Sequence, residues 1–254
     1  MSGTVTRRLS AGGLPLLGGA VVTGGWWVAG AAGVSPGLLP PPHAVVATFG
    51  RLPGVLAEAT RVTAVETVAG FTLAGLLGIA TGVLLACLRP VAAAVYPVLV
   101  GLQAVPKLAL APLLVVTLGF GPAPKIVMVV LVCTFPIVLA TATGLTRTPA
   151  ELVELTRSLS ASWWQTLVKL RLPHALPQIF AGLQQAAPLA VIGAVVGELF
   201  GATAGLGYTI RVATADAPLV YAALFLLAAL SISLFYLLVA AERWLLPWIR
   251  LTTA

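Results

Sequence analysis

Long stretches without charge are the feature of this sequence that most constrains its fold. From Leu9 to Gly50 there is no Asp, Glu, Lys or Arg, and further apolar runs follow as far as Ala241. Charged residues make up 8% of the 254 residues, whereas soluble domains carry about 25%. A water-exposed surface cannot be assembled from so few charges. The sequence therefore predicts an all-α, polytopic membrane protein that forms one transmembrane domain over residues 1–254.

Six apolar stretches are long enough to cross a bilayer, for which a helix needs about 20 residues. They are 14–34, 62–88, 91–118, 125–145, 176–199 and 219–241. The first lies in a run too long for the apolar segment of a secretion signal, so an uncleaved span is expected there. A shorter amphipathic piece at 42–56 is expected to lie at a membrane surface. The second span has small residues at a spacing that lets helix backbones approach closely in lipid: Gly70, Gly75, Gly78 and Gly82.

The composition also excludes several kinds of function. The formal net charge is +7, but the basic residues are scattered at the ends of apolar runs, so nucleic-acid binding is not expected. Cys87 and Cys133 lie in apolar runs without metal-ligand spacing and are interpreted as small buried hydrophobes. Because the chain has no Ser/His pair, HExxH motif or paired aspartates, we expect no catalytic residue, metal or cofactor on it.

One long polar segment, 148–173, interrupts the apolar pattern. Thr148-Pro149-Ala150-Glu151 predicts a helix that starts with a capping box, and Ser162-Trp163-Trp164-Gln165 predicts a second such start. Three leucines fall at helical spacing on one side of the first helix: Leu152, Leu155 and Leu159. Because Pro173 and Pro177 follow, we expect a compact pair of short amphipathic helices between two spans.

The distribution of Lys and Arg predicts the orientation in the membrane. With both termini in the cytoplasm, nine basic residues fall inside, four fall outside and Lys107 lies within the membrane. The inner set is Arg7, Arg8, Arg89, Arg147, Arg157, Lys169, Arg171, Arg243 and Arg250, and the outer set is Arg51, Arg61, Lys125 and Arg211. The same orientation places segment 148–173 in the cytoplasm.

The spacing within this segment resembles the EAA loop of the membrane subunits of ATP-binding-cassette (ABC) importers. Glu154, a small residue six positions later at Ser160, and Leu170-Arg171-Leu172-Pro173 follow that pattern. Leu155 and Thr156 replace its two alanines, and Ser160 replaces its glycine. That glycine would supply a left-handed turn, which serine adopts only with some strain.

The resemblance implies a permease subunit whose loop, 148–173, couples it to a cytoplasmic ABC ATPase. The implied coupling residues are Glu151, Glu154, Arg157, Leu159, Ser160, Ala161, Ser162 and Trp164. The implied assembly contains two copies of this permease, an ATPase dimer that binds ATP and Mg, and an extracytoplasmic substrate-binding protein, in a bacterial cytoplasmic membrane. The chain has no GxxxxGK[ST] motif, so ATP hydrolysis is expected on a separate subunit.

Further stretches resemble particular branches of these importers, and the resemblance extends from about Leu39 to Arg250. The segments 103–113, 119–121 and 135–137 resemble permeases for sulfonate, taurine and nitrate. The segment 196–208 (VGELFGATAGLGY) resembles the thiamine-pyrimidine and riboflavin relatives. The cargo that this resemblance implies is a small organic anion or a vitamin-like metabolite.

Polar residues inside the apolar spans are candidates for the translocation path: Gln103, Lys107, Gln184, Gln185 and Glu198. A charge within the membrane is costly, so Lys107 should face a water-filled cavity, form a structural ion pair, for which Glu198 is a candidate partner, or extend to a membrane interface. The glutamines either line the path or form interhelical hydrogen bonds. Glu198 either contributes to an external gate or docking site, or satisfies backbone donors in the turn that follows it.

An ion-coupled secondary transporter is the alternative function. Such proteins often carry inverted repeats and intramembrane acids that bind protons or ions. No internal repeat is found here, and Glu66 and Glu198 both lie close to the ends of predicted spans. The sequence therefore favours the ABC permease.

Overall fold

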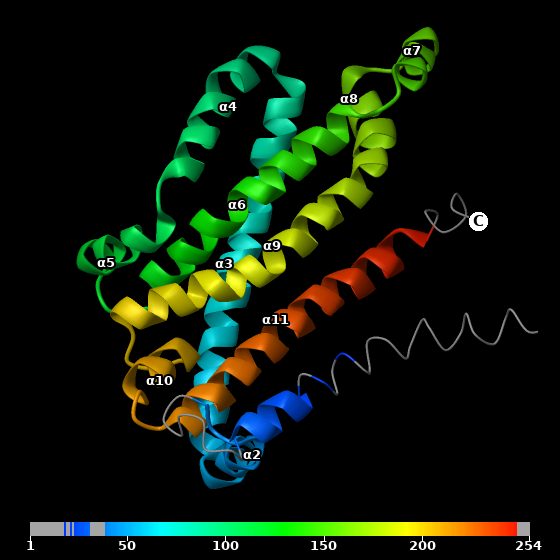
Figure 1. Cartoon of the computed structure of the whole chain (residues 1–254). Helices are drawn as coiled ribbons and strands as arrows, with labels where there is room; N and C mark the ends of the chain where they lie inside the picture. Colours follow the sequence, from blue (N-terminus) through cyan, green and yellow to red (C-terminus); the bar gives the residue numbers. More distant parts are fainter. Residues whose placement is uncertain (1–17, 19–20, 22, 31–38, 248–254) are drawn as a thin grey trace, which may run out of the picture.

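The structure is a computed structural model that describes residues 18, 21, 23–30 and 39–247. These residues form helices and short connections, without a strand, which confirms the all-α class (Figure 1). About half of the predicted first span, 14–34, falls outside the described residues. Within its described part, Trp26 donates from Nε1 to the Pro40 carbonyl at 3.0 Å and its ring lies 6.1 Å from that of Tyr221.

Four helical stretches of the described chain are long and apolar enough to cross a membrane: Pro53–Cys87 (α3), Ala123–Thr146 (α6), Trp163–Gly201 and Ala217–Leu245 (α11). They contain the predicted spans 125–145, 176–199 and 219–241, and the predicted span 62–88 up to Cys87. Two short helices lie at one end of the bundle, α2 (Pro42–Arg51) and α10 (Leu206–Val212), while α7 (Ala150–Ser158) projects from the other end (Figure 1).

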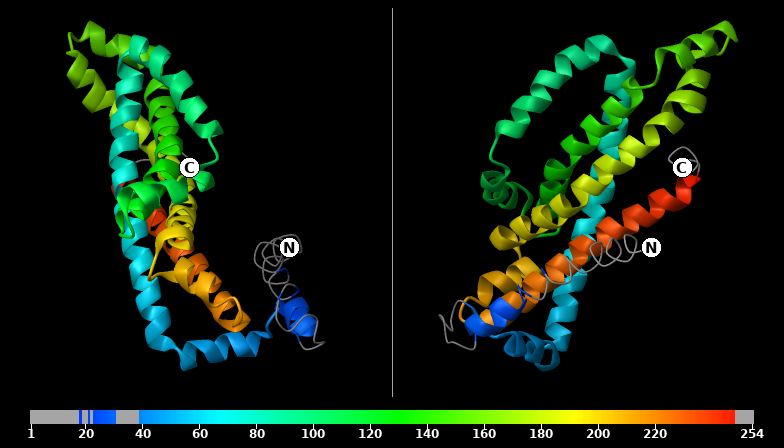
Figure 2. Two further views of the ribbon diagram at one scale, coloured as in Figure 1. Left: turned by 90° about the vertical axis from the view of Figure 1, so that its left-hand side faces the viewer. Right: turned by 45° about the vertical axis from the view of Figure 1, so that its right-hand side comes forward.

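The predicted third span, 91–118, is wrong as a single helix. The chain forms α4 (Arg89–Ala104) and α5 (Lys107–Leu118) instead. Val105 between them is extended, with φ −71° and ψ 127°. The reason is Pro106, which lacks an N–H group and disfavours helical backbone in the residue before it. In the α4–α5 arm (residues 89–118), α4 arches away from the other helices in Figure 2, whereas α5 returns to them, with Ala111 and Val115 buried against α6 and α9 (Leu172–Gly201).

The core of the fold is the packing of α3, α6 and α9 (Leu172–Gly201) against one another. Glycines allow this close contact. A Cβ atom placed on Gly182 of α9 would lie 2.3 Å from the Cβ of Ala140, and one on Gly78 of α3 would lie 2.8 Å from the Cβ of Ile137. Real side chains do not approach so closely, so the three helices can pack at this spacing only without those side chains.

The glycines predicted to line α3 do not all serve this contact. Gly70, Gly78 and Gly82 face α6 at distances that exclude a Cβ, whereas a Cβ on Gly75 would meet only Leu183 Cδ2 at 3.7 Å, an ordinary contact. Cys133 is fully buried in the same core, as predicted, and Cys87 is half-buried. Both cysteines are free thiols.

Candidate functional site

The polar segment folds into an elbow (residues 149–171) at the end of the bundle opposite α2 (Figure 1). Its first predicted capping box is wrong. Pro149 is the N-cap of α7, no side chain caps the helix, and the Thr148 hydroxyl donates backwards to the Leu145 carbonyl at 3.2 Å. Glu151 stands in the first turn of α7, where its charge complements the helix dipole.

The turn after α7 has the left-handed geometry that the family pattern calls for. Ser160 has φ 55°, and it is the one described residue other than glycine with a positive φ. The N–H of Ser160 donates to the Arg157 carbonyl and the N–H of Ala161 to the Thr156 carbonyl, both at 2.9 Å. These two bonds form a Schellman motif, which closes the end of a helix by satisfying its last carbonyls. Serine therefore takes the place of glycine with the turn preserved.

The second predicted capping box is confirmed. The Ser162 hydroxyl accepts from the Gln165 N–H at 3.2 Å, and the Gln165 side chain accepts from the Ser162 N–H at 2.8 Å. The two helices of the elbow are joined as well by a 3.2 Å contact between the hydroxyls of Thr156 and Thr166. Reciprocal caps and a side-chain bond across the turn make the elbow a defined shape rather than a loose loop.

The prediction of two short helices is correct for the first, α7, but wrong for the second. α8 (Trp163–Thr166) continues through a π turn (Leu167–Arg171) directly into α9, so the elbow and the fifth span form one helical stretch. In the π turn the Leu172 N–H bonds to the Leu167 carbonyl. Pro173 does not end the helix; it lies directly after the π turn, and the helical stretch continues through it as α9.

Most of the predicted coupling residues are exposed on the elbow: Glu151, Glu154, Arg157, Leu159, Ser160, Ser162 and Trp164, with Ala161 half-buried. The leucines of α7 and of its C-cap are not covered by the described part of this chain, since Leu155 is 55% exposed and the C-cap residue Leu159 72%. The rings of Trp163 and Trp164 meet edge to face at 4.8 Å and are also exposed.

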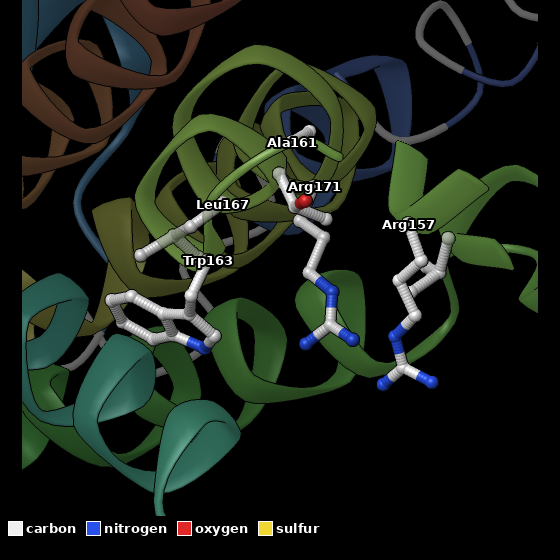
Figure 3. Close-up of a pocket in the computed structure, with 7 residues that line it drawn as sticks. Arg157, Ala161, Trp163, Leu167 and Arg171 are labelled. Carbon is white, nitrogen blue, oxygen red and sulfur yellow. The ribbon is translucent and has the colours of Figure 1, made fainter. Parts of the chain in front are cut away.

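A small cavity of about 170 Å³ lies inside the elbow and is lined by residues of both arms, among them Arg157, Trp163 and Arg171. Figure 3 shows the Arg157 and Arg171 side chains extending in the same direction, with the Trp163 indole on the other side of Arg171. Arg171 Nε is buried without a hydrogen-bond partner in the described chain. The cavity thus offers two guanidinium groups beside an aromatic ring.

A second, larger cavity of about 500 Å³ lies between the α4–α5 arm and helices α3 and α6. Its wall is mainly apolar and includes Phe135, with Thr81 and Thr134 as small polar groups. Two of the predicted path residues meet here, since the Lys107 ammonium donates to the Gln103 side-chain oxygen. Lys107 therefore faces a cavity, and the alternative of an ion pair with Glu198 is wrong.

The other predicted path residues lie elsewhere. Gln184 of α9 donates to Glu242 Oε2 of α11 at 2.6 Å, which is the interhelical hydrogen bond of the alternative interpretation. Gln185 is exposed on α9. Glu198 is fully buried at the α10 end of the core, where it accepts from the Gly207 N–H at 2.5 Å. It satisfies a backbone donor in the first turn of α10, just after the turn that the second interpretation named.

Sequence reasoning missed the surroundings of Glu198. Thr63 of α3 contacts its carboxyl, and Glu66 of α3 forms a buried 2.7 Å ion pair with Lys125 of α6. The partners are 135 and 59 positions apart in the chain. The sequence does indicate that these charged residues need partners, because they lie in or next to apolar spans. It does not indicate which residues pair.

Known proteins with similar sequences are membrane transport subunits. The chain is 40% identical to a probable ABC transporter permease of Haemophilus influenzae (78% of this chain, 82% of the relative). It is 40% identical to the formylaminopyrimidine transport permease ThiX of Halalkalibacterium halodurans (70% and 72%). It is 35% identical to the riboflavin transport permease RibX of Chloroflexus aurantiacus (88% and 85%).

A solved structure supports the fold. A chain from the inward-facing MetNI methionine ABC transporter is similar with a TM-score of 0.61 and 23% identity, covering 70% of this chain and 92% of that one. At this identity the likeness concerns the fold alone. Residues 75–251 match the family described as "Binding-protein-dependent transport system inner membrane component". The chain therefore belongs to this family of ABC transporter permease subunits.

Proposed function

We propose that this chain forms one half of the membrane pathway of an ABC importer and that its elbow is the part gripped by a cytoplasmic ATPase dimer. The observation that carries the proposal is the exposed leucine face of α7. Exposed leucines next to one another call for a partner surface. Glu151, Glu154 and Arg157 on the same short helix argue against lipid as that partner. The remaining partner is another protein, with a groove that binds the apolar face of the helix.

The structure of the elbow suits the transmission of movement. Its turn is closed by backbone bonds and a capping box, so a displacement of α7 is not absorbed by a flexible loop. Its second arm is continuous with α9, a helix of the core. Closure of an ATPase pair would therefore tilt α9 and change access to the pathway between the helices.

The cargo is a small organic molecule that carries a ring or an anionic group. The relatives named above support this class, since one is named for a formylaminopyrimidine and one for riboflavin. The cavity beside the α4–α5 arm fits it too, with an apolar wall, the Phe135 ring and the Lys107–Gln103 pair. Ligand sites of this kind combine an apolar lining with a few polar groups. A second copy of this chain and an extracytoplasmic binding protein complete the proposed assembly, with both termini in the cytoplasm.

Crosslinking tests the central claim. In a background with Cys87→Ser and Cys133→Ala, single cysteines at Leu155 and Leu159 should crosslink to the co-expressed ATPase. A cysteine at Glu58, exposed at the opposite end of the bundle, is the matched control and should not. Crosslinks from Glu58 and none from the two leucine positions would overturn the proposal.

Transport assays in vesicles separate the two functions considered. We expect uptake to require ATP and to be lost in Glu154→Lys, which reverses a charge on the exposed face of the elbow. Uptake that continues without ATP and collapses with an ionophore would instead establish an ion-coupled transporter.

A further inference from the structure

The cavity inside the elbow has the lining of an anion site. It measures about 170 Å³, and its charged residues are Arg157 of α7 and Arg171 of the π turn, while none of the residues that line it is acidic. Both guanidinium groups extend in the same direction, and the Trp163 indole lies beside Arg171 (Figure 3). Two positive charges at one small cavity repel each other, so an anion between them would stabilise the pair.

Neither arginine finds a partner for its charge within the described chain. The ion pairs of the described residues involve other side chains. Glu154, three positions before Arg157 on α7, is exposed and forms no ion pair with it there. The Nε atom of Arg171 is buried without a hydrogen-bond partner, and a buried donor on a charged group is costly when it stays unpaired. Both guanidinium groups therefore have donors left for an anion.

The cavity lies where helices that can cross the membrane end. Leu167, which lines it, shares an apolar cluster with Leu145, and Cys87 packs against the same cluster. Cys87 is the last residue of α3, and Leu145 is next to the last residue of α6. Trp163 begins the apolar stretch that contains α9. Spans end where hydrocarbon gives way to lipid headgroups, and exposed tryptophans are enriched at this depth.

Phosphate is the anion that this arrangement suits best. A guanidinium group binds phosphate through two parallel N–H···O bonds, and several oxygens of one phosphate group can be shared between two arginines. A single carboxylate has two oxygens and offers fewer acceptors. Phosphate groups are also the anions that lie at the depth of the cavity in any phospholipid bilayer.

The cavity uses a different face of α7 from the one proposed to contact the ATPase. Val153 and Arg157 both line the cavity and, four positions apart, share one face of the helix. The exposed Leu155 lies two positions from each of them, which is roughly the opposite side of the helix. A ligand in the cavity and a partner on the leucine face can therefore be bound at the same time.

We propose that the elbow cavity binds a phosphate group between Arg157 and Arg171, supplied by the headgroup of an anionic phospholipid or by phosphate in solution. The depth of the cavity favours the headgroup. The acyl chains would stay beside the apolar helices, so the charges of α7 do not oppose this contact. A bound phosphate would connect α7 to the π turn and so hold the two arms of the elbow together. The inference stands whether or not the elbow binds an ATPase.

Two probes distinguish the sources of the phosphate group. Full-length protein in detergent, freed of lipid, is titrated with phosphatidylglycerol and, separately, with inorganic phosphate at constant ionic strength. Native mass spectrometry measures retained lipid, and the melting temperature reports on inorganic phosphate. We expect phosphatidylglycerol to bind. A rise in melting temperature with inorganic phosphate alone would support the site with phosphate from solution as its ligand. A response to neither probe would overturn the proposal.

Matched variants separate the cavity from the general positive charge of the elbow. Arg171→Gln should weaken binding of the responding probe roughly tenfold, as expected for a lost charge-assisted hydrogen bond, and Arg157→Gln should weaken it as well. Lys169→Gln removes a charge from an exposed position that does not line the cavity, so it should bind like wild type. Equal weakening by Lys169→Gln and Arg171→Gln would overturn the proposal. If Arg171→Gln fails to fold, Arg157→Gln, at an exposed side chain, decides against the same control.

An acidic side chain of the ATPase is the rival occupant of the cavity. It would be identified if neither phosphate probe bound while Arg171→Gln, but not Lys169→Gln, reduced co-purification of the co-expressed ATPase. That result would overturn the phosphate proposal and leave the proposed function intact. Absence of the crosslink from Leu155 would instead count against the proposed function, without affecting the binding of phosphate.

Discussion

The α3–α6–α9 core and helix α4 of the arm are built from similarly apolar residues but pack in opposite ways. Val129 and Ala190 of the core are completely buried, whereas Val98 of α4 is 59% exposed. Gly182 in the core has no space for a methyl group, while Gly101 in the arm has no atom within 4 Å of where a Cβ would lie. In lipid, apolar surface alone does not drive helices together, and small residues decide which helices approach closely. Hydropathy therefore identifies both regions as apolar without distinguishing them.

Among the substitutions proposed, the largest loss of stability is expected where the buried ion pair of the core is broken. Lys125→Met leaves a buried carboxylate without its partner, and we expect a loss of about 3–5 kcal/mol in the free energy of unfolding. The double variant Lys125→Met/Glu66→Gln removes both charges and should regain much of that loss. Chemical unfolding in detergent measures both. Equal destabilisation by the single and double variants would show that packing, not charge, dominates at this point.

The next largest loss of stability is expected when a methyl group is added to the core. Gly182→Ala forces α9 away from Ala140 of α6, and overpacking of this kind costs about 1–3 kcal/mol. The matched control is Gly101→Ala in the arm, which should leave the melting temperature unchanged or slightly higher. If both substitutions have the same effect, the contrast between core and arm is not one of packing.

A substitution in the arm should affect transport more than stability. Lys107→Met keeps the length of the side chain and removes the charge that faces the larger cavity. We expect roughly tenfold slower uptake, which corresponds to about 1.4 kcal/mol, with the melting temperature preserved. Gln185→Ala, on the exposed surface of α9, is the control. Unaltered uptake by Lys107→Met would remove this lysine from the pathway.

The smallest change in stability is expected when an ion pair at the surface is removed. Arg51 and Asp216 form a 2.6 Å ion pair that is largely exposed, and such pairs contribute about 0–1 kcal/mol. Arg51→Ala should therefore change the melting temperature little, and less still at high salt. A loss as large as that of Lys125→Met would mean that this pair is shielded from water in the assembled protein.

The sequence predicted local features well where one short segment determines them. The capping box at Ser162 depends on four neighbouring residues and is predicted correctly. The geometry of the turn at Ser160 stayed open in the sequence, because serine replaces the glycine of the family pattern, and the structure shows it to be left-handed. The same four-residue pattern at Thr148 failed because the Thr148 hydroxyl bonds back to α6, and pattern alone does not reveal that competing acceptor. The coupling role of these residues stays a prediction.

The sequence could not predict features that depend on distant contacts. Pro106 was visible in the third apolar stretch, but a proline inside an apolar run is compatible with a kinked helix as well as a break. Thr63, a partner of Glu198, lies 135 positions away, and a charge inside an apolar span indicates that it needs a partner without indicating which residue that is. The partner of Lys107 is Gln103, only four positions away, but that contact forms where the chain breaks between α4 and α5.

The continuity of the elbow with α9 has a mechanical consequence. Trp163 and Gly201 are the ends of a single 39-residue stretch, roughly 58 Å long at the rise of an α-helix. The elbow and α9 thus form one continuous helical arm, from the exposed Trp163–Trp164 pair to the buried end of α9 at Glu198. A displacement of the tryptophan pair would either bend this arm at Pro177 and Pro188, where backbone hydrogen bonds are missing, or reach the packing around Glu198.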